Sequence, residues 1–377
     1  MAKETSKGHK KHADIKRPSL GVYGRHELGL IGAPCGVIKK IVEHVADALK
    51  DQVSITYLDA DHQEGMRPPY SRATDHISHD SIEYASQHND FDRKLAFTSS
   101  DLLLINGNHF LAGSQIVFCT EKKRDSLLRK LDRLTDVKMI ILDHGIEKPH
   151  DFLTAHIDSL DEVQIYKIDQ LTEISNWILT HHQAHQPTVK GLVLAGGKSQ
   201  RMGQPKELLD YHGLKQVDYA AQILEEAGMT PHISCRDKDQ ARAYNDYNCI
   251  VDSYTGLGPN GAILSAFRED PDSAWCVIAC DQPLLQSAHL THLLSQREMS
   301  KMATCYHNPE TGWPEPLITI WEPRAYQRLL SFLGLGYSCP RKVLINSDTH
   351  VVQVEDTSFM KNANTPEERK QILADLK

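Results

Sequence analysis

A glycine-rich segment in the middle of the chain carries the clearest chemical signal in the sequence. It reads Leu192-Val-Leu-Ala-Gly-Gly-Lys-Ser-Gln-Arg-Met-Gly-Gln-Pro-Lys206, an apolar run that passes into glycines and cations. Glycines let successive backbone N–H groups approach an anion closely and point at phosphate oxygens, and nearby cations add the positive charge that a triphosphate attracts. We therefore expect a phosphate-binding turn between a strand and a helix. Its principal residues are Gly196, Gly197, Ser199, Arg201, Gly203 and Lys206.

A single aspartate follows the most apolar strand expected in the second half of the chain. Asp281 comes directly after the run Trp275-Cys-Val-Ile-Ala-Cys280. Open α/β sheets bind ligands at the carboxyl ends of their strands, which is where this carboxylate would lie. Magnesium is held by one or two carboxylates together with substrate phosphates. We predict that Asp281 is a magnesium ligand; the plainer alternative is an aspartate that only caps a strand end.

Two further segments have polar residues at comparable places. Asp252 closes the expected strand Cys249–Val251 and precedes Gly258-Pro259, so its carboxylate is placed to accept hydrogen bonds from a base or ribose. The alternative is an ordinary turn ahead of a helix. Near the C-terminus, Asn362 and Asn364 stand just before a strong helix start, which also fits a turn.

The glycine-rich segment resembles the signature of the molybdenum cofactor guanylyltransferases, the MobA-like nucleotidyltransferases. Three later segments follow in the family's order: Asp252 with GLGPNGAILSAF, Cys280-Asp-Gln-Pro-Leu, and Asn362-Ala-Asn-Thr-Pro-Glu. The resemblance covers the chain from Lys190 to its end. It implies a Rossmann-like nucleotidyltransferase fold that transfers GMP from GTP to the phosphate of molybdopterin and releases pyrophosphate.

The resemblance also assigns roles to particular residues. It implies catalytic roles for three side chains, Lys206, Arg201 and Asp281, the last as the magnesium ligand. It implies a nucleotide pocket formed by Leu194, Ala195, Gly196, Gly197, Lys206, Asp252, Gly258 and Pro259. The pterin substrate would face Asn362 and Asn364.

The nucleotide and the acceptor are less firmly determined than the reaction class. Pro205 stands where guanylyltransferases often have an acidic residue and is commoner in related cytidylyltransferases, whereas the pair Gly196-Gly197 favours guanine. We expect GTP and molybdopterin as substrates, magnesium as cofactor, and a molybdoenzyme or cofactor-assembly protein as a possible partner. The alternatives are a nucleotidyltransferase that uses CTP or a sugar or alcohol phosphate, and a non-catalytic scaffold that binds the cofactor.

The first half of the chain has a glycine loop in the place of a P-loop. The segment Gly29-Leu-Ile-Gly-Ala-Pro-Cys-Gly-Val-Ile-Lys-Lys40 lies between a strand and an amphipathic helix. A working P-loop requires a lysine and then Ser or Thr after its last glycine, but Val37 and Ile38 occupy those places. Lys39 and Lys40 come later and are expected to face solvent. The arrangement weakly resembles a degenerate MobB-like P-loop domain, the adaptor that accompanies the guanylyltransferase. Three alternatives stay open for this domain: it binds a partner, it binds the pterin, or it binds no small molecule.

Short apolar runs alternate with helical periods along the whole chain, which predicts an α/β protein with mainly parallel sheets. We expect a flexible basic tail over residues 1–20, a degenerate P-loop-like three-layer α/β domain over 21–186, and a nucleotidyltransferase domain over 187–377. In the first domain the periodicity predicts a long loop at 61–80 and helices at 121–134 and 171–180. Expected strands there cover 28–31, 53–58, 102–105, 137–142 and 163–168.

The second domain is expected to alternate in the same way. Helices are predicted at 217–227, 239–247 and 260–268, with a closing helix after Asn364 that has a capping box of Thr365 and Glu368. Expected strands cover 191–194, 232–235, 249–251, 274–280 and 351–354.

Composition restricts the remaining possibilities. The net charge of −8 argues against a nucleic-acid partner, and no apolar run is long enough to span a membrane. The basic N-terminus lacks the apolar core of a secretory signal, so we expect a cytoplasmic protein with reduced cysteines.

Three histidines near the expected domain boundary, His181, His182 and His185, carry imidazoles that suit a transition metal. They fall in an expected linker, and we favour no metal site there.

Overall fold

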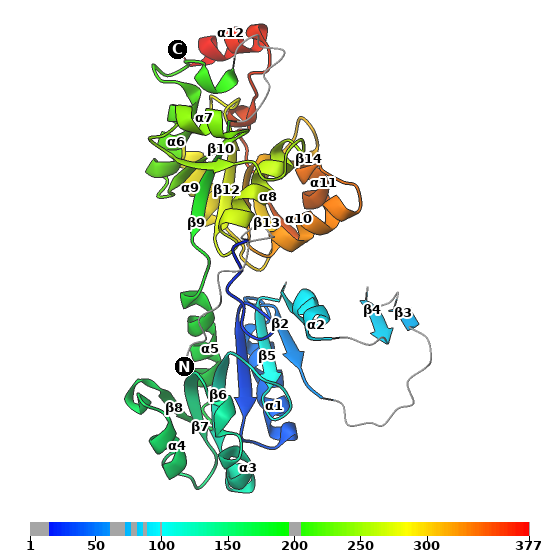
Figure 1. Ribbon diagram of the computed structural model, residues 1–377, viewed down its shortest axis with the longest axis vertical. Coiled ribbons are helices and arrows are strands. Elements are labelled where there is room, and N and C mark those ends of the chain that lie inside the picture. Colours follow the sequence, from blue (N-terminus) through cyan, green and yellow to red (C-terminus); the bar gives the residue numbers. More distant parts are fainter. Residues whose placement is uncertain are drawn as a thin grey trace, which may run out of the picture. The chain divides into compact units, whose positions relative to one another are not determined.

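The computed structural model of the chain describes residues 15–60, 72–76, 81–85, 89–98, 100–195 and 205–376. The chain divides into two compact units (Figure 1). The first unit comprises residues 19–186, and the second comprises Pro187 to the C-terminus together with residues 15–18. Each unit has one large sheet between layers of helices, which confirms the expected α/β class.

The sheet of the first unit is parallel throughout, with the strand order β2-β5-β1-β6-β7-β8. All five strands expected from the sequence are present. β6 was not predicted, although its Ile116-Val-Phe-Cys119 run is fully buried, as an interior strand requires. The strands are β1 (Glu27–Ile31), β2 (Ile55–Leu58), β5 (Leu102–Asn106), β6 (Ser114–Cys119), β7 (Val137–Leu142) and β8 (Gln164–Lys167).

Two helices cover one face of this sheet and pack against each other, α1 (Cys35–Leu49) and α5 (Leu171–Ala184). The apolar stripe of α1 is buried and its Lys39 and Lys40 are exposed, as expected. The prediction that the last helix ends at Thr180 is wrong. α5 continues through His181 because this imidazole stacks on the Trp177 ring, with centroids 4.7 Å apart, and so adds packing to the final turn.

The opposite face of the first sheet is covered by shorter pieces, and here one prediction fails. The expected helix at 121–134 is broken into η2 (Glu121–Lys123), α3 (Arg124–Leu128) and η3 (Leu131–Arg133). Beyond the end of α3, Lys130 and Arg133 donate to backbone carbonyls of the loop that follows β5, at 2.9 and 3.2 Å. The remaining helical pieces are α2 (Asp90–Phe97), α4 (Asp151–His156) and η4 (Leu160–Glu162).

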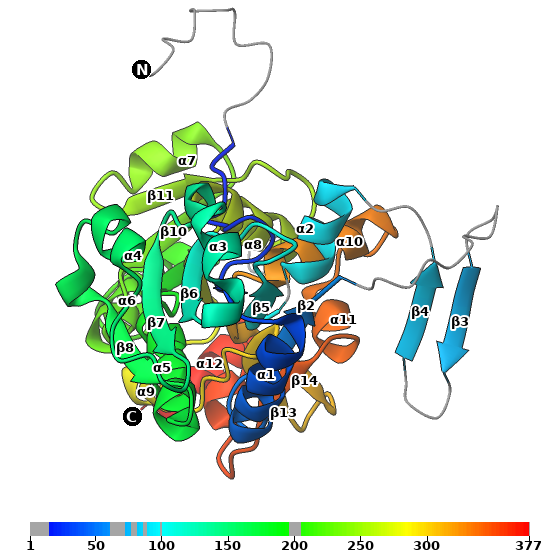
Figure 2. The ribbon, with the colours of Figure 1, turned by 90° about the horizontal axis from the view of Figure 1, so that it is seen from below.

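The stretch expected to be one long loop, residues 61–80, contains part of a small ribbon. β3 (Arg72–His76) pairs antiparallel with β4 (Ser81–Ala85) in a separate two-stranded sheet (Figure 2). The two strands pair their backbone N–H and C=O groups with each other. The polar sequence of this stretch does not show the apolar alternation by which a strand is predicted. The rest of this stretch lies outside the described residues.

The second unit has a mixed sheet with the order β11-β10-β9-β12-β14-β13-β15. Its first four strands are mutually parallel, and β14 runs antiparallel to both of its neighbours. The five expected strands are present, and β13 and β14 were not predicted. The strands are β9 (Val189–Leu194), β10 (Pro231–Cys235), β11 (Asn248–Val251), β12 (Ala274–Ala279), β13 (Ala303–Asn308), β14 (Trp313–Trp321) and β15 (Thr349–Val352).

Helices cover both faces of this sheet and give it a Rossmann-like architecture (Figure 1). On one face lie α6 (Gln216–Glu226) and α9 (Ser287–Ser295), and on the other α8 (Pro259–Glu269), α10 (Ala325–Gly334) and α11 (Pro340–Ile345). The helix expected at 239–247 is shorter, because α7 (Lys238–Ala243) ends at Tyr244, whose ring turns into the core. The remaining pieces are η5 (Lys206–Leu208), η6 (Ser358–Met360) and α12 (Pro366–Asp375), the last with its predicted capping box.

The cysteines and the helices bear on two of the sequence expectations. All eight cysteines are free, and five of them are buried. No described helix has the length and apolarity required to cross a bilayer. Among the described residues no group of three or more His, Cys, Asp or Glu side chains is arranged to hold a metal, so the imidazoles of His181, His182 and His185 do not form such a group.

Candidate active site

The topology of the second sheet determines where a ligand would bind. From β9 the chain moves outward through β10 to β11, and then returns to the other side of β9 to form β12. The connections that follow β9 and β12 therefore leave in opposite directions. In open α/β sheets this switch point opens a crevice at the carboxyl ends of the strands. The predicted phosphate-binding turn follows β9, and Asp281 follows β12.

A lysine, an aspartate and an asparagine meet at this switch point. The ammonium of Lys206 donates to Asp281 Oδ2 at 3.0 Å. The same ammonium donates to Asn364 Oδ1, from a residue 158 positions away in the sequence. The side chains of Lys206 and Asp281 are each 20% exposed, so the ion pair is sheltered but open to a ligand.

Local structure explains how such distant residues come together. Lys206 is the first residue of η5, which begins directly after Pro205. The amide of Ala363 donates to the carbonyl of Asp281 at 2.7 Å and so fastens the C-terminal segment beside β12. The Glu368 carboxylate accepts a hydrogen bond from the backbone N–H of Asn364 at 2.6 Å, and this bond fixes the asparagine just before α12.

The Asp281 carboxylate is incompletely satisfied. Its Oδ1 is buried and has no hydrogen-bond partner among the described residues, whereas Oδ2 is paired with Lys206. An unpaired buried charged oxygen is costly, and a bound cation or a polar ligand removes that cost. A carboxylate oxygen is also the type of ligand that magnesium prefers. The observed residue therefore fits the predicted metal ligand, with water and substrate phosphates left to complete the coordination.

Asp252 lies at the same edge but farther along it. It follows β11, which is three strand positions from β12, so these two strands are about 14 Å apart in the sheet. Its Oδ1 accepts from the Ser234 hydroxyl at 3.1 Å. Burial raises the pKa of Asp252, and the bond from Ser234 opposes that shift. Asp252 and Asp281 cannot contact the same phosphate, but they are spaced to contact opposite ends of a nucleotide.

Other predicted residues border the same edge. Gly258, with φ of 57°, immediately precedes α8, and Pro259 is the first residue of that helix. Leu194 ends β9, and the carbonyl of the buried Ala195 accepts from Gln240 Nε2 at 2.8 Å. Asn362 is exposed. The phosphate-turn residues Gly196, Gly197, Ser199, Arg201 and Gly203 lie outside the described residues.

Four polar residues near these elements were not predicted. Burial raises the pKa of Glu207, which receives a 3.3 Å hydrogen bond from Gln240. Asn260 and Gln282 are buried, and in the described part of the chain neither amide atom of either residue has a hydrogen-bond partner. Asn260 lies inside the GLGPNGAILSAF segment, and Gln282 follows Asp281. A polar residue within an otherwise apolar motif is the sequence signal from which these two site residues could have been predicted.

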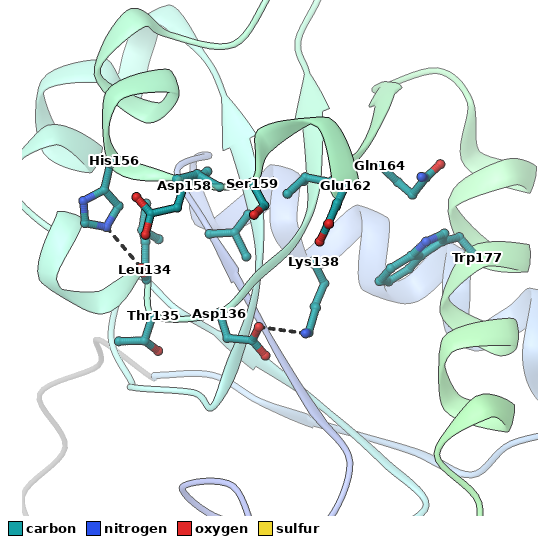
Figure 3. Close-up of a pocket in the computed structure, with 13 residues that line it drawn as sticks. Leu134, Thr135, Asp136, Lys138, His156, Asp158, Ser159, Glu162, Gln164 and Trp177 are labelled. Carbon is teal, nitrogen blue, oxygen red and sulfur yellow. Dashed lines mark hydrogen bonds and ion pairs between the residues drawn. The ribbon is translucent and has the colours of Figure 1, made fainter.

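A cavity of about 590 Å³ lies in the first unit (Figure 3). It is located at the starts of β7 and β8, which is the amino edge of that sheet, and Trp177 lines it from α5. The Asp136 carboxylate pairs there with Lys138 at 2.7 Å. Parallel sheets bind ligands at the other edge, so the switch point of the second sheet remains the better candidate for catalysis.

Comparison with known proteins agrees with the architecture of this site. Residues 191–351 match the family model of the MobA-like NTP transferase domain. The second unit is therefore similar to such a domain over these residues, and Lys206, Asp252 and Asp281 all lie within the match.

Relatives with assigned names share this half of the chain. The chain is similar to a "Molybdenum cofactor biosynthesis bifunctional protein" of Synechocystis, with 32% identity over 50% of this chain and 54% of that protein. The match thus spans about half the length of that relative. A "Molybdenum cofactor guanylyltransferase" of Xanthomonas euvesicatoria is 29% identical over 47% of this chain and 90% of its own length. A solved structure, molybdopterin-guanine dinucleotide biosynthesis protein A from Archaeoglobus fulgidus, is 24% identical over 49% of this chain and 97% of its own, with a TM-score of 0.43.

Proposed function

We propose that the second unit is a magnesium-dependent nucleotidyltransferase that transfers GMP from GTP to the terminal phosphate of molybdopterin and releases pyrophosphate. The observation that carries this proposal is the pairing of Lys206 with Asp281 at the switch point of a MobA-like NTP transferase domain. The names of the relatives, which include guanylyltransferases, support the choice of nucleotide and acceptor.

The reaction requires charge stabilisation more than bond-making chemistry from the protein. An oxygen of the acceptor phosphate forms a bond to the α-phosphorus of GTP, and the bond to the β-phosphate oxygen breaks on the opposite side. The acceptor oxygen is already anionic, so no base is needed. Lys206 lies where it can neutralise charge on the transferred phosphoryl group, and Asn364 Oδ1 holds its ammonium in place.

Asp281 has the properties required of the metal ligand. Its unpaired buried Oδ1 can take the cation while Oδ2 keeps its bond to Lys206. Asp281 would hold magnesium there, and the ion would supply positive charge to the substrate phosphates. Lys206 would add a second positive charge beside the same carboxylate.

The nucleoside would extend along the strand ends toward β11. Asp252, at the end of a strand about 14 Å from β12 across the sheet, would accept hydrogen bonds from the base or the ribose, and its Oδ1 accepts a hydrogen bond from the Ser234 hydroxyl. Gly258 and the first turn of α8 adjoin it. The pterin would then lie toward the C-terminal segment that carries Asn362 and Asn364.

Pyrophosphate release from each of the four nucleoside triphosphates, with molybdopterin and magnesium present, tests this proposal. We expect release with GTP. We also expect Asp281→Asn to lower the rate by about 10²–10³-fold or more. Asp239→Asn is a matched control, because this aspartate is an exposed partner of Arg242 on α7.

The same assay, repeated with a sugar phosphate and an alcohol phosphate as acceptors, and a thermal unfolding measurement with each triphosphate separate the alternatives. Release with CTP alone, which Pro205 favours, would change the nucleotide and keep the reaction. Release only with a sugar or alcohol phosphate would change the acceptor. An unchanged rate in Asp281→Asn would reject the metal-ligand role. If no triphosphate shifts the thermal unfolding of the protein, the non-catalytic scaffold is the better description.

A further inference from the structure

A thiol and an imidazole lie against each other at the carboxyl edge of the first sheet. Cys35 Sγ is 3.3 Å from His109 Nε2. Cys35 is the first residue of α1 and follows β1, whereas His109 follows β5, the strand that pairs with β1. Both side chains are partly exposed. This edge is where an open α/β sheet binds ligands, and the pair has the spacing of a nucleophile and its base.

A carboxylate from the next strand acts on the imidazole. Asp59 follows β2, and it accepts hydrogen bonds from the Tyr57 hydroxyl at 2.9 Å and from Asn106 Nδ2 at 2.8 Å. Burial would raise the pKa of Asp59, but these bonds and the amide of Ala60 outweigh burial and lower it. Its charge interacts favourably with a protonated His109. Asp59 therefore stabilises the imidazolium that forms when His109 takes a proton.

The surrounding loops hold this group rigidly. Asn108 Nδ2 donates to the carbonyl of Ala33 at 2.8 Å and so fastens the loop after β5 to the turn that carries the thiol. The carbonyl of Asn108 accepts from Lys130 Nζ at 2.9 Å. A network with these distances keeps the thiol and the imidazole at a fixed separation, which covalent catalysis requires.

The start of α1 supplies hydrogen-bond donors beside the sulfur. Val37 and Ile38 make the first bonds of the helix, to the carbonyl of Pro34 at 2.8 and 3.1 Å. The amides of Cys35 and Gly36 precede those bonds and point out from the helix start. A Cβ built on Gly36 would have no described atom within 4 Å, which leaves room for a bound group. Two amides at a helix start next to a nucleophile can form an oxyanion hole.

We propose that Cys35 is the nucleophile of a second active site. An activated carboxylic ester or thioester acylates its sulfur. His109 is the general base and acid, and Asp59 is a positioning residue that acts through His109. The reaction is independent of nucleotidyl transfer and needs no group from the second unit.

The step balances with the substrate and water alone. The thiol proton passes to His109 Nε2 as the sulfur–carbon bond forms, and the carbonyl electron pair moves to the oxygen, which the amides of Cys35 and Gly36 bind. The ester oxygen, or the thioester sulfur, then leaves with the proton from His109. In the second half, His109 takes a proton from water, which attacks the acyl-enzyme and releases the carboxylic acid and the free thiol.

Acetylation of the full-length chain by p-nitrophenyl acetate tests the proposal. We expect a burst of nitrophenolate and an acetyl group on the peptide that contains Cys35, found by mass spectrometry. The protein should carry Cys339→Ser, which removes the one exposed thiol. Cys35→Ser should abolish the burst. His109→Gln should slow acetylation by about 10²–10⁴-fold, whereas His144→Gln, at an exposed histidine of the same unit, should leave it unchanged.

A second readout separates positioning from simple loss of structure. Asp59→Asn should move the acidic limb of the rate profile to lower pH, because the imidazolium loses a stabilising charge. A uniform loss of rate at every pH would reject the role of Asp59. Equal thermal unfolding of the variants and the parent shows that the fold is kept. Acetylation of Cys35 that is no faster than that of a free thiol, or that does not depend on His109, would overturn the proposal.

Discussion

The two units place their first strand-to-helix connection at the same point of a parallel sheet, yet the connections differ in almost every chemical respect. In the first unit only Gly32, Ala33 and Pro34 separate β1 from α1, and Asn108 closes over this short turn. In the second unit the chain after β9 is longer and delivers Lys206 to Asp281. The topology thus provides an edge where ligands bind, while the length and side chains of the connection determine the chemistry.

The largest expected effect is a loss of nucleotidyl transfer on replacing the lysine that follows the second connection, compared with a lysine that follows the first. Lys206→Ala should lower kcat/KM for nucleotidyl transfer by about 10²–10³-fold, because charge on the transferred phosphoryl group loses its fixed cation. Lys39→Ala, in the helix after the first turn, should have no effect, since this lysine is exposed and pairs only loosely with Glu43 at 3.9 Å. Steady-state pyrophosphate release measures both variants. A loss of equal size in the two would mean that the first turn also binds the triphosphate.

A smaller effect concerns the backbone of the two regions. Gly32 has φ of 98°, and a Cβ there would lie 2.4 Å from the carbonyl oxygen of Phe118. Gly32→Ala should therefore lower the free energy of unfolding by about 2–3 kcal/mol or more. Gly258, with φ of 57° and ψ of −140°, has open space around it, so Gly258→Ala should cost only the backbone strain, about 1–3 kcal/mol, with no added clash. Urea unfolding compares the two, and equal losses would show that the short first turn is not tightly packed.

The smallest effect is a pH dependence confined to the first unit. Burial, with the positive charges of His185 and Lys138, lowers the pKa of His181 to about 4 from its ordinary 6.5. Between these values the unfolded chain takes up a proton that the folded chain does not, so stability falls as the pH drops from 6.5 to 4.

This pH dependence should weaken in His181→Gln. Trp177 stacks on His181 and is the tryptophan of the first unit, so its fluorescence reports urea unfolding there. Midpoints measured at pH 7 and pH 5 should differ more for the parent than for the variant. If the two proteins lose equal stability, then another group controls the acid response.

Much of the fold could be predicted because its periodicity is local. The stripe of α1, the apolar run of β12 and the capping box of α12 each follow from residues within one or two turns. β14 was harder to predict, because its prolines at 314 and 316 interrupt the alternation of polar and apolar residues that is typical of an antiparallel strand. The broken segment after Glu121 was also beyond local reasoning, because Lys130 and Arg133 are held by a loop that precedes them by more than 20 residues.

In the candidate site, too, some residues could be predicted from local motifs, whereas their contacts could not. Lys206 and Asp281 were identifiable from their motifs, but their direct ion pair depends on the strand order, which brings β12 beside β9. The contact of Asn364 with Lys206 depends on the C-terminal segment folding back along β12. The unpaired amides of Asn260 and Gln282 are properties of packing, which a sequence without its structure does not display.

The most direct test of the central claim is the mass of the product. Purified protein is incubated with molybdopterin, GTP and magnesium, and the pterin fraction is analysed by mass spectrometry beside an Asp281→Asn sample. We predict a pterin that carries one GMP in the parent reaction and unmodified pterin in the variant reaction. Unmodified pterin in both reactions, or the same GMP-bearing product in both, would contradict the assignment of nucleotidyl transfer to the edge formed by Lys206 and Asp281.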